Sequence, residues 1–306
     1  MRITIIDMGT NTFHLLIADI KNNKLDFIMQ KKIAVKIGKG GINNGLILNE
    51  AKKRALDCLG MFKKISLEYK VDKIKAVATS AFRSAKNSGE LLWEIKKDLG
   101  INIDVISGDK EAVLIAKGVR TAMDIGKTPI MIMDIGGGSV EFIIANKTKN
   151  LWAKSFEIGG QRLLEKFHKK DPISKEGIDA LRYYLEDQLD IVLEMGIKFK
   201  IRTLIGSSGT FDTINDIHKA RIMDKTKTYS KGHITTQSFL KIYEDLIQKD
   251  RIERLLIPGM IEMRVDMIVV ATILIKFLID RLNLNQLKVS PYALKEGFLF
   301  DTLGNQ

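Results

Sequence analysis

Two acidic residues, Asp7 and Asp134, each end an apolar run and precede a turn of glycine and hydroxyl-bearing residues. The first turn reads Asp7-Met-Gly-Thr-Asn-Thr12, and the second reads Asp134-Ile-Gly-Gly-Gly-Ser139. Glycine lets a backbone come close to a phosphate, because no Cβ intervenes and positive φ is allowed. A carboxylate beside such a turn can hold a magnesium ion on that phosphate. A lone turn of this kind is usually only a tight turn, but two copies favour chemistry.

The two turns divide the chain into two similar halves. Apolar runs that read as strands flank them, at 3–7 and 13–20 around the first turn and at 130–134 and 140–145 around the second. Strands precede helices in both halves, which is typical of α/β proteins. We therefore expect two domains, 1–125 and 126–306, that face a shared cleft and clamp a polyanion between their turns.

A third loop, Gly206-Ser-Ser-Gly-Thr210, follows an apolar strand at 202–205. Ligands of α/β sheets bind at the carboxyl ends of strands, so this loop joins the candidate site. It lacks the Lys of a P-loop, which excludes a Walker-type site. The candidate phosphate-binding residues of the three loops are Gly9, Thr10, Asn11, Thr12, Gly136, Gly137, Gly138, Ser139, Gly206, Ser207, Ser208, Gly209 and Thr210.

Three charged residues outside the loops are further candidates. Arg83 follows a strand end in an expected loop, where a guanidinium can fork onto a phosphate or simply face solvent. Glu111 begins a helix, where a carboxylate can act as a general base or only stabilise the helix end. Glu141 lies two residues after Ser139 on a strand and points to the same face, so it can be a second metal ligand beside Asp134.

Composition describes an ordinary globular protein with a basic surface. The 306 residues carry 49 Lys and Arg against 37 Asp and Glu, a net charge of +12. Such a surface favours anionic partners, although a basic pI can also only follow genome composition. Cys58 is alone, which excludes a disulfide framework. Asp7 interrupts the apolar N-terminus, so we expect no signal peptide and a cytoplasmic protein.

Two apolar patterns predict helices in the second half. Residues 172–195 carry apolar side chains at helical spacing, so we expect one long amphipathic helix there. Met267 to Ile279 is too short to span a bilayer and reads as a core helix. The basic stretch 218–233 is either a solvated loop or the path of a long polyanion. We expect the last helix, 293–303, to be able to pack back on the first domain.

Several motifs together resemble the exopolyphosphatase and guanosine pentaphosphate phosphohydrolase (Ppx/GppA) family. They follow the family's order and cover nearly the whole chain: Asp7-Met-Gly-Thr-Asn-Thr-Phe-His14, Thr79-Ser-Ala-Phe-Arg83, Ile106-Ser-Gly-Asp-Lys-Glu-Ala112, Asp134-Ile-Gly-Gly-Gly-Ser139, Gly206-Ser-Ser-Gly-Thr210, Pro258-Gly-Met with Arg264-Val-Asp266, and Val289-Ser290 with Ala293-Leu-Lys-Glu-Gly297. Lys110 stands where the family has a first Glu, which makes the site entrance more basic.

The resemblance implies the actin, sugar kinase and heat-shock chaperone fold, with two ribonuclease H-like domains around a cleft. It implies a hydrolase that releases the terminal phosphate of polyphosphate, or the 5′-γ-phosphate of guanosine pentaphosphate, with Mg²⁺ or alternatively Mn²⁺. Glu111 matches the family's catalytic Glu and Arg83 its phosphate-contacting Arg, while Asp134 and Glu141, with Asp7, are the expected metal ligands. Longer family members add a C-terminal helical region, which this sequence lacks. We therefore expect no processive action on very long polyphosphate chains.

Three rival functions stay open at this point. They are a small-molecule kinase of the same fold, a sensor that binds polyphosphate or an alarmone without hydrolysis, and an actin-like filament protein. We expect no membrane or nucleic-acid partner, and a homodimer stays open. The sequence does not separate polyphosphate from guanosine pentaphosphate.

Overall fold

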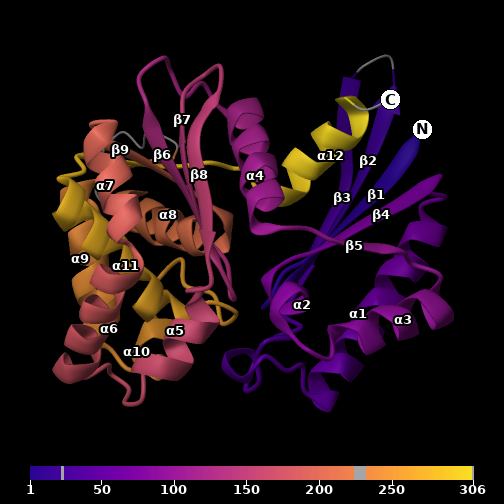
Figure 1. Ribbon diagram of the computed structural model, residues 1–306, viewed down its shortest axis with the longest axis horizontal. Helices are drawn as coiled ribbons and strands as arrows, with labels where there is room; N and C mark the ends of the chain where they lie inside the picture. Colours follow the sequence, from indigo (N-terminus) through magenta and orange to yellow (C-terminus); the bar gives the residue numbers. More distant parts are fainter. Residues whose placement is uncertain (22–23, 224–231, 305–306) are drawn as a thin grey trace.

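The protein has two α/β halves with similar sheets, and two helices lie between them (Figure 1). The computed structural model describes residues 1–21, 24–223 and 232–304. The first sheet has the order β3-β2-β1-β4-β5 and the second the order β10-β11-β9-β6-β7-β8. Each sheet therefore has two antiparallel strands on one side of a central strand and parallel strands on the other side, and the second sheet adds the antiparallel edge strand β10. The predicted class of two related α/β domains is confirmed.

The first sheet and its helices occupy residues 2–105. The strands are β1 (Arg2–Met8), β2 (Phe13–Lys21), β3 (Lys24–Ile33), β4 (Lys73–Ala78) and β5 (Ile103–Val105). The helices are the 3₁₀ turn η1 (Ile42–Asn44), α1 (Asn49–Glu68), α2 (Ser80–Ser84) and α3 (Ser88–Leu99). Ile6 and Met8 of β1 pack on one side with Leu59 and Phe62 of α1. Alternate residues of β1 face the opposite side of the sheet, as the strand period requires.

The second sheet and its helices follow from residue 130. The strands are β6 (Ile130–Ile135), β7 (Val140–Ala145), β8 (Asn150–Phe156), β9 (Thr203–Ser207), β10 (His233–Thr235) and β11 (Gln286–Val289). The helices are α5 (Gly160–Phe167), α6 (Lys175–Gln188), α7 (Asp190–Lys198), α8 (Ser208–Met223), α9 (Thr236–Gln248), α10 (Arg251–Leu255) and α11 (Met267–Leu282). Strands β6 and β7 are buried on both faces, which explains why they are apolar apart from Asp134 and Glu141.

The remaining helices, α4 (Gly108–Ala122) and α12 (Leu294–Gly304), pack against each other between the sheets. Helix α4 covers Ile132 and Ile143 of the second sheet, although it precedes that sheet in the sequence. Helix α12 ends the chain but packs Leu299 on Ile3 and Ile5 of β1. The last helix thus packs back on the first half, as expected. Each half thus contributes one helix that packs into the hydrophobic core of the other half, which holds the two halves together.

Two expectations about elements need correction. The predicted helix 172–195 is two helices, which meet at Leu189. The apolar pattern continues through this break because Leu185 and Val192 both enter the core, so periodicity could not reveal it. The loop 206–210 is instead the end of β9 and the first turn of α8, and Ser208 makes the bend with φ of 69°.

Two further findings concern the C-terminal half. The predicted core helix is confirmed, since α11 is buried almost all round. None of the helices in the described ranges is both long and apolar enough to cross a bilayer. The basic stretch 218–233 begins on α8, where His218 is buried, and residues 224–231 lie outside the described residues.

The close crossing of α4 and α12 generates the first prediction. A Cβ on Gly297 would overlap the Leu114 carbonyl oxygen, so Gly297→Ala must push the two helices apart. We expect a loss of roughly 1–3 kcal/mol in the free energy of unfolding, measured by denaturant titration. Gly89→Ala on α3 is the matched control, because nothing lies within 4 Å of its Cβ. A Gly297→Ala variant as stable as that control would contradict the packing argument.

Candidate active site

The strand register of the first sheet places three polar side chains in a row. Asp7 of β1 lies directly opposite His14 of β2, and His14 lies opposite Lys32 of β3. Residues opposite each other on neighbouring strands point to the same face of the sheet. The row therefore faces the space between the two halves, where all three side chains line one pocket.

The second sheet repeats this arrangement with different side chains. Asp134 of β6 lies opposite Glu141 of β7, and Glu141 lies opposite Ser155 of β8. The Ser155 hydroxyl donates to Glu141 Oε1 at 2.7 Å. On the other side of Asp134, Ser207 and Ser208 donate to its Oδ2 at 2.9 and 2.6 Å. The two rows thus occupy equivalent positions on equivalent strands of the two sheets.

A small pocket of about 70 Å³ between the rows brings most of the predicted site residues together. Its walls include Asp7, Gly9, Thr10, Asn11, Thr12, Glu111, Asp134, Gly136, Gly137, Gly138, Ser139, Glu141 and Ser208. We call it the reaction pocket. Of the other predicted residues, Gly209 lines a second pocket, which adjoins the reaction pocket. Ser207 is buried behind Asp134, and Gly206 and Thr210 line neither pocket.

The turns of the two halves touch each other above this pocket. A Cβ on Gly138 would lie 2.5 Å from Thr10 Oγ1 and would also overlap Ser80 Oγ. Only glycine fits at Gly138, because the two turns pack so closely there. Phosphate binding by this turn stays a prediction. Two buried polar atoms at this contact, Thr10 Oγ1 and Asn11 Oδ1, have no hydrogen-bond partner within the described chain. Unpaired buried groups are costly, and an anion with its hydration can satisfy them.

Arg83 and Glu111 form an ion pair at the edge of the reaction pocket. Helix α4 begins after Ser107, whose hydroxyl oxygen accepts a hydrogen bond from the Lys110 backbone N–H. Glu111 therefore lies in the first turn of the helix. Arg83 Nη1 donates to Glu111 Oε2 and to the Ile106 carbonyl, both at 3.0 Å. The expected loop position of Arg83 is wrong, because it lies on the short helix α2. Arg83 reaches the pocket through Glu111 and does not line its wall.

The carboxylates of the reaction pocket disfavour one another's charge. Burial, together with neighbouring carboxylates, raises the pKa of Asp7 to about 7 and that of Glu141 to about 8. Burial and Glu141 also raise the pKa of Glu111, while Arg83 lowers it. Burial raises the pKa of Asp134, which the two serine hydroxyls oppose. So many carboxylates in one cleft call for protons or for a cation.

The donor set fits a magnesium ion that is shared with a substrate. Across the residues that the structure describes, no group of three or more His, Cys, Asp and Glu could hold a metal ion. Magnesium, however, usually binds one or two carboxylates and takes its other ligands from water and substrate phosphates. Asp134 with Glu141 or Asp7 can supply one or two such carboxylates. Burial is the main cause that raises the pKa of all three, so a bound cation would stabilise their charged forms.

Sequence reasoning missed Arg264 as a site residue. Its side chain is only 7% exposed, it lines the reaction pocket, and its Nε has no partner within the described residues. A buried guanidinium without a partner fits a bound anion. Arg264 was named only in a family segment, and no local pattern marks it. It comes to the site through the tertiary fold, from the residues before α11.

Sequence reasoning also missed Glu157, which joins the two halves at the rim. Its carboxylate accepts from Ser80 Oγ at 2.5 Å and Arg83 Nη2 at 3.1 Å in the first half. In the second half it accepts from Arg162 Nη2 at 2.8 Å. Arg162 also donates to the Ile42 carbonyl and to Ser84 Oγ across the gap. The Arg83 guanidinium is thus held by two carboxylates.

The Ppx/GppA phosphatase family profile matches residues 16–306. The chain belongs to the Ppx/GppA phosphatase family. It is 42% identical to an exopolyphosphatase from Cytophaga hutchinsonii whose crystal structure covers 100% of this chain and 98% of its own, with a TM-score of 0.94. A crystal structure of the Aquifex aeolicus Ppx/GppA family member is 26% identical, with 100% and 98% coverage and a TM-score of 0.79.

The sequence relatives in this phosphatase family carry two kinds of name. A Haemophilus influenzae protein, provisionally named an exopolyphosphatase, is 28% identical over 97% of this chain and 90% of its own length. A Photobacterium profundum guanosine-5′-triphosphate,3′-diphosphate pyrophosphatase is 26% identical over 97% of this chain. The chain spans 58% of the length of that relative.

The buried carboxylates generate a prediction on pH. The pKa of Glu141 is raised from 4.5 to about 8, so the folded protein holds a proton that the unfolded chain has lost between these values. Stability that depends on this proton is therefore lost as pH rises from about 5 to 8. Without divalent cations, we expect the free energy of unfolding of Glu141→Gln to rise relative to that of the unmodified protein as pH increases through this range. The expected change is a few kcal/mol in order of magnitude.

Urea denaturation at pH 5, 6, 7 and 8 measures this difference. Glu68→Gln is the control, since Glu68 is exposed on α1, and its difference should stay flat with pH. A flat difference for Glu141→Gln as well would mean that Glu141 is not held in its protonated form.

Proposed function

We propose that the protein is a phosphoanhydride hydrolase that releases the terminal phosphate of inorganic polyphosphate, of guanosine pentaphosphate, or of both. One observation carries the proposal. Glu111 is buried at the wall of the reaction pocket, held by Arg83 and next to the turns that begin at Asp7 and Asp134. Membership of the Ppx/GppA phosphatase family supports the reaction class.

The terminal phosphate would bind among the two turns and Arg264. The unpaired Thr10 hydroxyl and the Arg264 guanidinium supply hydrogen bonds to its oxygens. Phosphoryl transfer passes through a loose transition state, so positioning and electrostatics provide most of the catalysis. Arg264 and the amides of the glycine turn can stabilise charge on the equatorial oxygens.

Magnesium would be held by Asp134 and Glu141, with Asp7 on the opposite wall. When bound, the ion offsets negative charge on the phosphoryl oxygens. Ser207 and Ser208 orient the Asp134 carboxylate by donating to its Oδ2, and Ser155 orients Glu141. Ser139 also hydrogen-bonds Glu141, so hydroxyl groups hold both carboxylates in place at the pocket.

Glu111 would take the proton of the attacking water. A general base works best when its pKa lies near the working pH, and burial moves the pKa of Glu111 upward toward that range. Arg83 limits this rise and fixes the direction of the carboxylate through the 3.0 Å bond to Oε2. The water oxygen bonds to the terminal phosphorus as the bridging oxygen leaves with the shortened chain.

Phosphate release with Mg²⁺, from polyphosphates and guanosine pentaphosphate side by side, tests this function directly. Release from either substrate supports the hydrolase. Binding of both without release from either would instead favour a sensor, and release that requires an acceptor together with ATP would favour a kinase.

Removal of the base should stop turnover and spare binding. We expect Glu111→Gln to lower kcat by roughly 10²–10⁴-fold, since the amide cannot accept the proton. The Kd for substrate, measured by calorimetry, should change no more than in Glu68→Gln. Unchanged turnover in Glu111→Gln would remove Glu111 from the mechanism.

The rim carboxylate Glu157 should oppose substrate binding. It occupies the second nitrogen of Arg83 and adds negative charge beside the pocket, at 43% side-chain exposure. We expect Glu157→Gln to lower KM about 2–5-fold with little change in kcat, because the amide oxygen still accepts from Ser80 and Arg162. A higher KM, relative to Glu68→Gln at the same ionic strength, would show that the Glu157 charge helps binding.

A further inference from the structure

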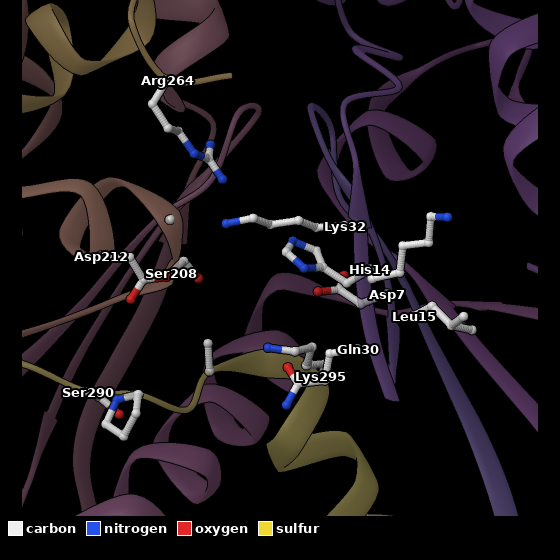
Figure 2. Close-up of a pocket in the computed structure, with 14 residues that line it drawn as sticks. Asp7, His14, Leu15, Gln30, Lys32, Ser208, Asp212, Arg264, Ser290 and Lys295 are labelled. Carbon is white, nitrogen blue, oxygen red and sulfur yellow. The ribbon is translucent and has the colours of Figure 1, made fainter. Parts of the chain in front are cut away.

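A second pocket of about 310 Å³ adjoins the reaction pocket (Figure 2). The two pockets share Asp7, His14, Ser208 and Arg264, so a ligand can extend from one into the other. Helix α12, strands β2 and β3, and the start of α8 form the remaining walls. We call it the inner-chain pocket.

Three cations point into the inner-chain pocket from different elements. Figure 2 shows Lys32 of β3 and Lys295 of α12 extending into the space that Arg264 enters from the opposite side. Lys32 stands opposite His14 in the strand register, which fixes its direction. It makes no ion pair with any residue in the described ranges, whereas Lys295 contacts Glu296 at 2.6 Å. The cations therefore have capacity for an anion.

The other walls offer little to a nucleoside. No aromatic ring other than the His14 imidazole is among the described residues that line the pocket, and its apolar members are Leu15, Pro291 and Ala293. The His14 imidazole lines the pocket and can donate a ring N–H to a phosphate oxygen. Asp7 and Asp212 are the acids here, against four cations that include the outlying Lys31.

We propose that the inner-chain pocket binds the inner phosphate groups of a linear inorganic polyphosphate, and that Lys32 and Lys295 make the protein prefer such a chain to a guanosine nucleotide. The inference rests on the hydrolase proposed above and names its substrate. The terminal phosphate lies in the reaction pocket, Arg264 spans the junction, and the next phosphates meet the two lysines. Each inner phosphate brings one negative charge, which opposing charges attract strongly when partly shielded from water.

The test combines lysine variants with a series of chain lengths. We expect Lys32→Met to raise KM roughly ten-fold for tripolyphosphate and longer chains, the size of one lost charge-assisted contact. For pyrophosphate, whose second group only begins to reach the pocket, the change should be smaller. Lys64→Met, an exposed residue of α1, removes the same charge far from the cleft and is the control.

Lys295→Met should act in the same direction, but it also leaves buried Glu296 without its cation. Its thermal unfolding is therefore measured alongside, and Lys32→Met alone decides the proposal. Equal KM values for Lys32→Met and Lys64→Met at every chain length would overturn it.

Binding in the Glu111→Gln background separates this inference from the hydrolase. Calorimetry there measures the Kd of inorganic polyphosphate and of guanosine pentaphosphate without turnover. We expect tighter binding of the inorganic chain, weakened by added Lys32→Met and not by added Lys64→Met. That result supports polyphosphate binding in the inner-chain pocket, whether or not the unmodified protein releases phosphate. A lack of phosphate release would count only against the proposed hydrolase. Tighter binding of guanosine pentaphosphate would overturn the proposed preference.

Discussion

Negative charge is concentrated in the reaction pocket, where the described lining residues include four carboxylates and one cation, Arg264. Glu111, Asp134 and Glu141 are each less than 7% exposed, and Asp7 faces them from the other sheet. Arg83 pairs with Glu111, whereas Asp134 and Glu141 make no ion pair within the described ranges and accept hydrogen bonds from serine hydroxyls. Buried carboxylates in that state favour a proton or a metal ion. The rest of the structure can be understood as the frame that keeps these groups together.

The frame is one plan used twice. Equivalent strands place Asp7 and Asp134 at the same point of each sheet, and strand register adds His14 and Lys32 in one half and Glu141 in the other. The acidic row suits a cation and the basic row suits a chain of phosphates. Helices α4 and α12 each pack on the other half's sheet, so both rows are held at the cleft from the two sides.

Local sequence predicted the parts of the site that depend on strand ends and turns. Asp7, Asp134 and their glycine turns were found because strand-turn-strand patterns are local. Arg264 and Glu157 were missed, because only tertiary packing brings them to the pocket. The break at Leu189 was missed because its apolar neighbours continue the helical period. Gly206 and Thr210 were predicted to bind phosphate, but Gly206 lies within β9 and Thr210 within the first turn of α8, and neither lines either pocket.

The central claim is that Glu111 directs water onto the terminal phosphorus of a chain seated in the cleft. Hydrolysis in ¹⁸O-labelled water with Mg²⁺ tests it, followed by mass spectrometry of both products under single-turnover conditions. The account predicts one ¹⁸O atom in the released phosphate and none in the shortened chain. Label in the shortened chain, or a product phosphate without label, would contradict it.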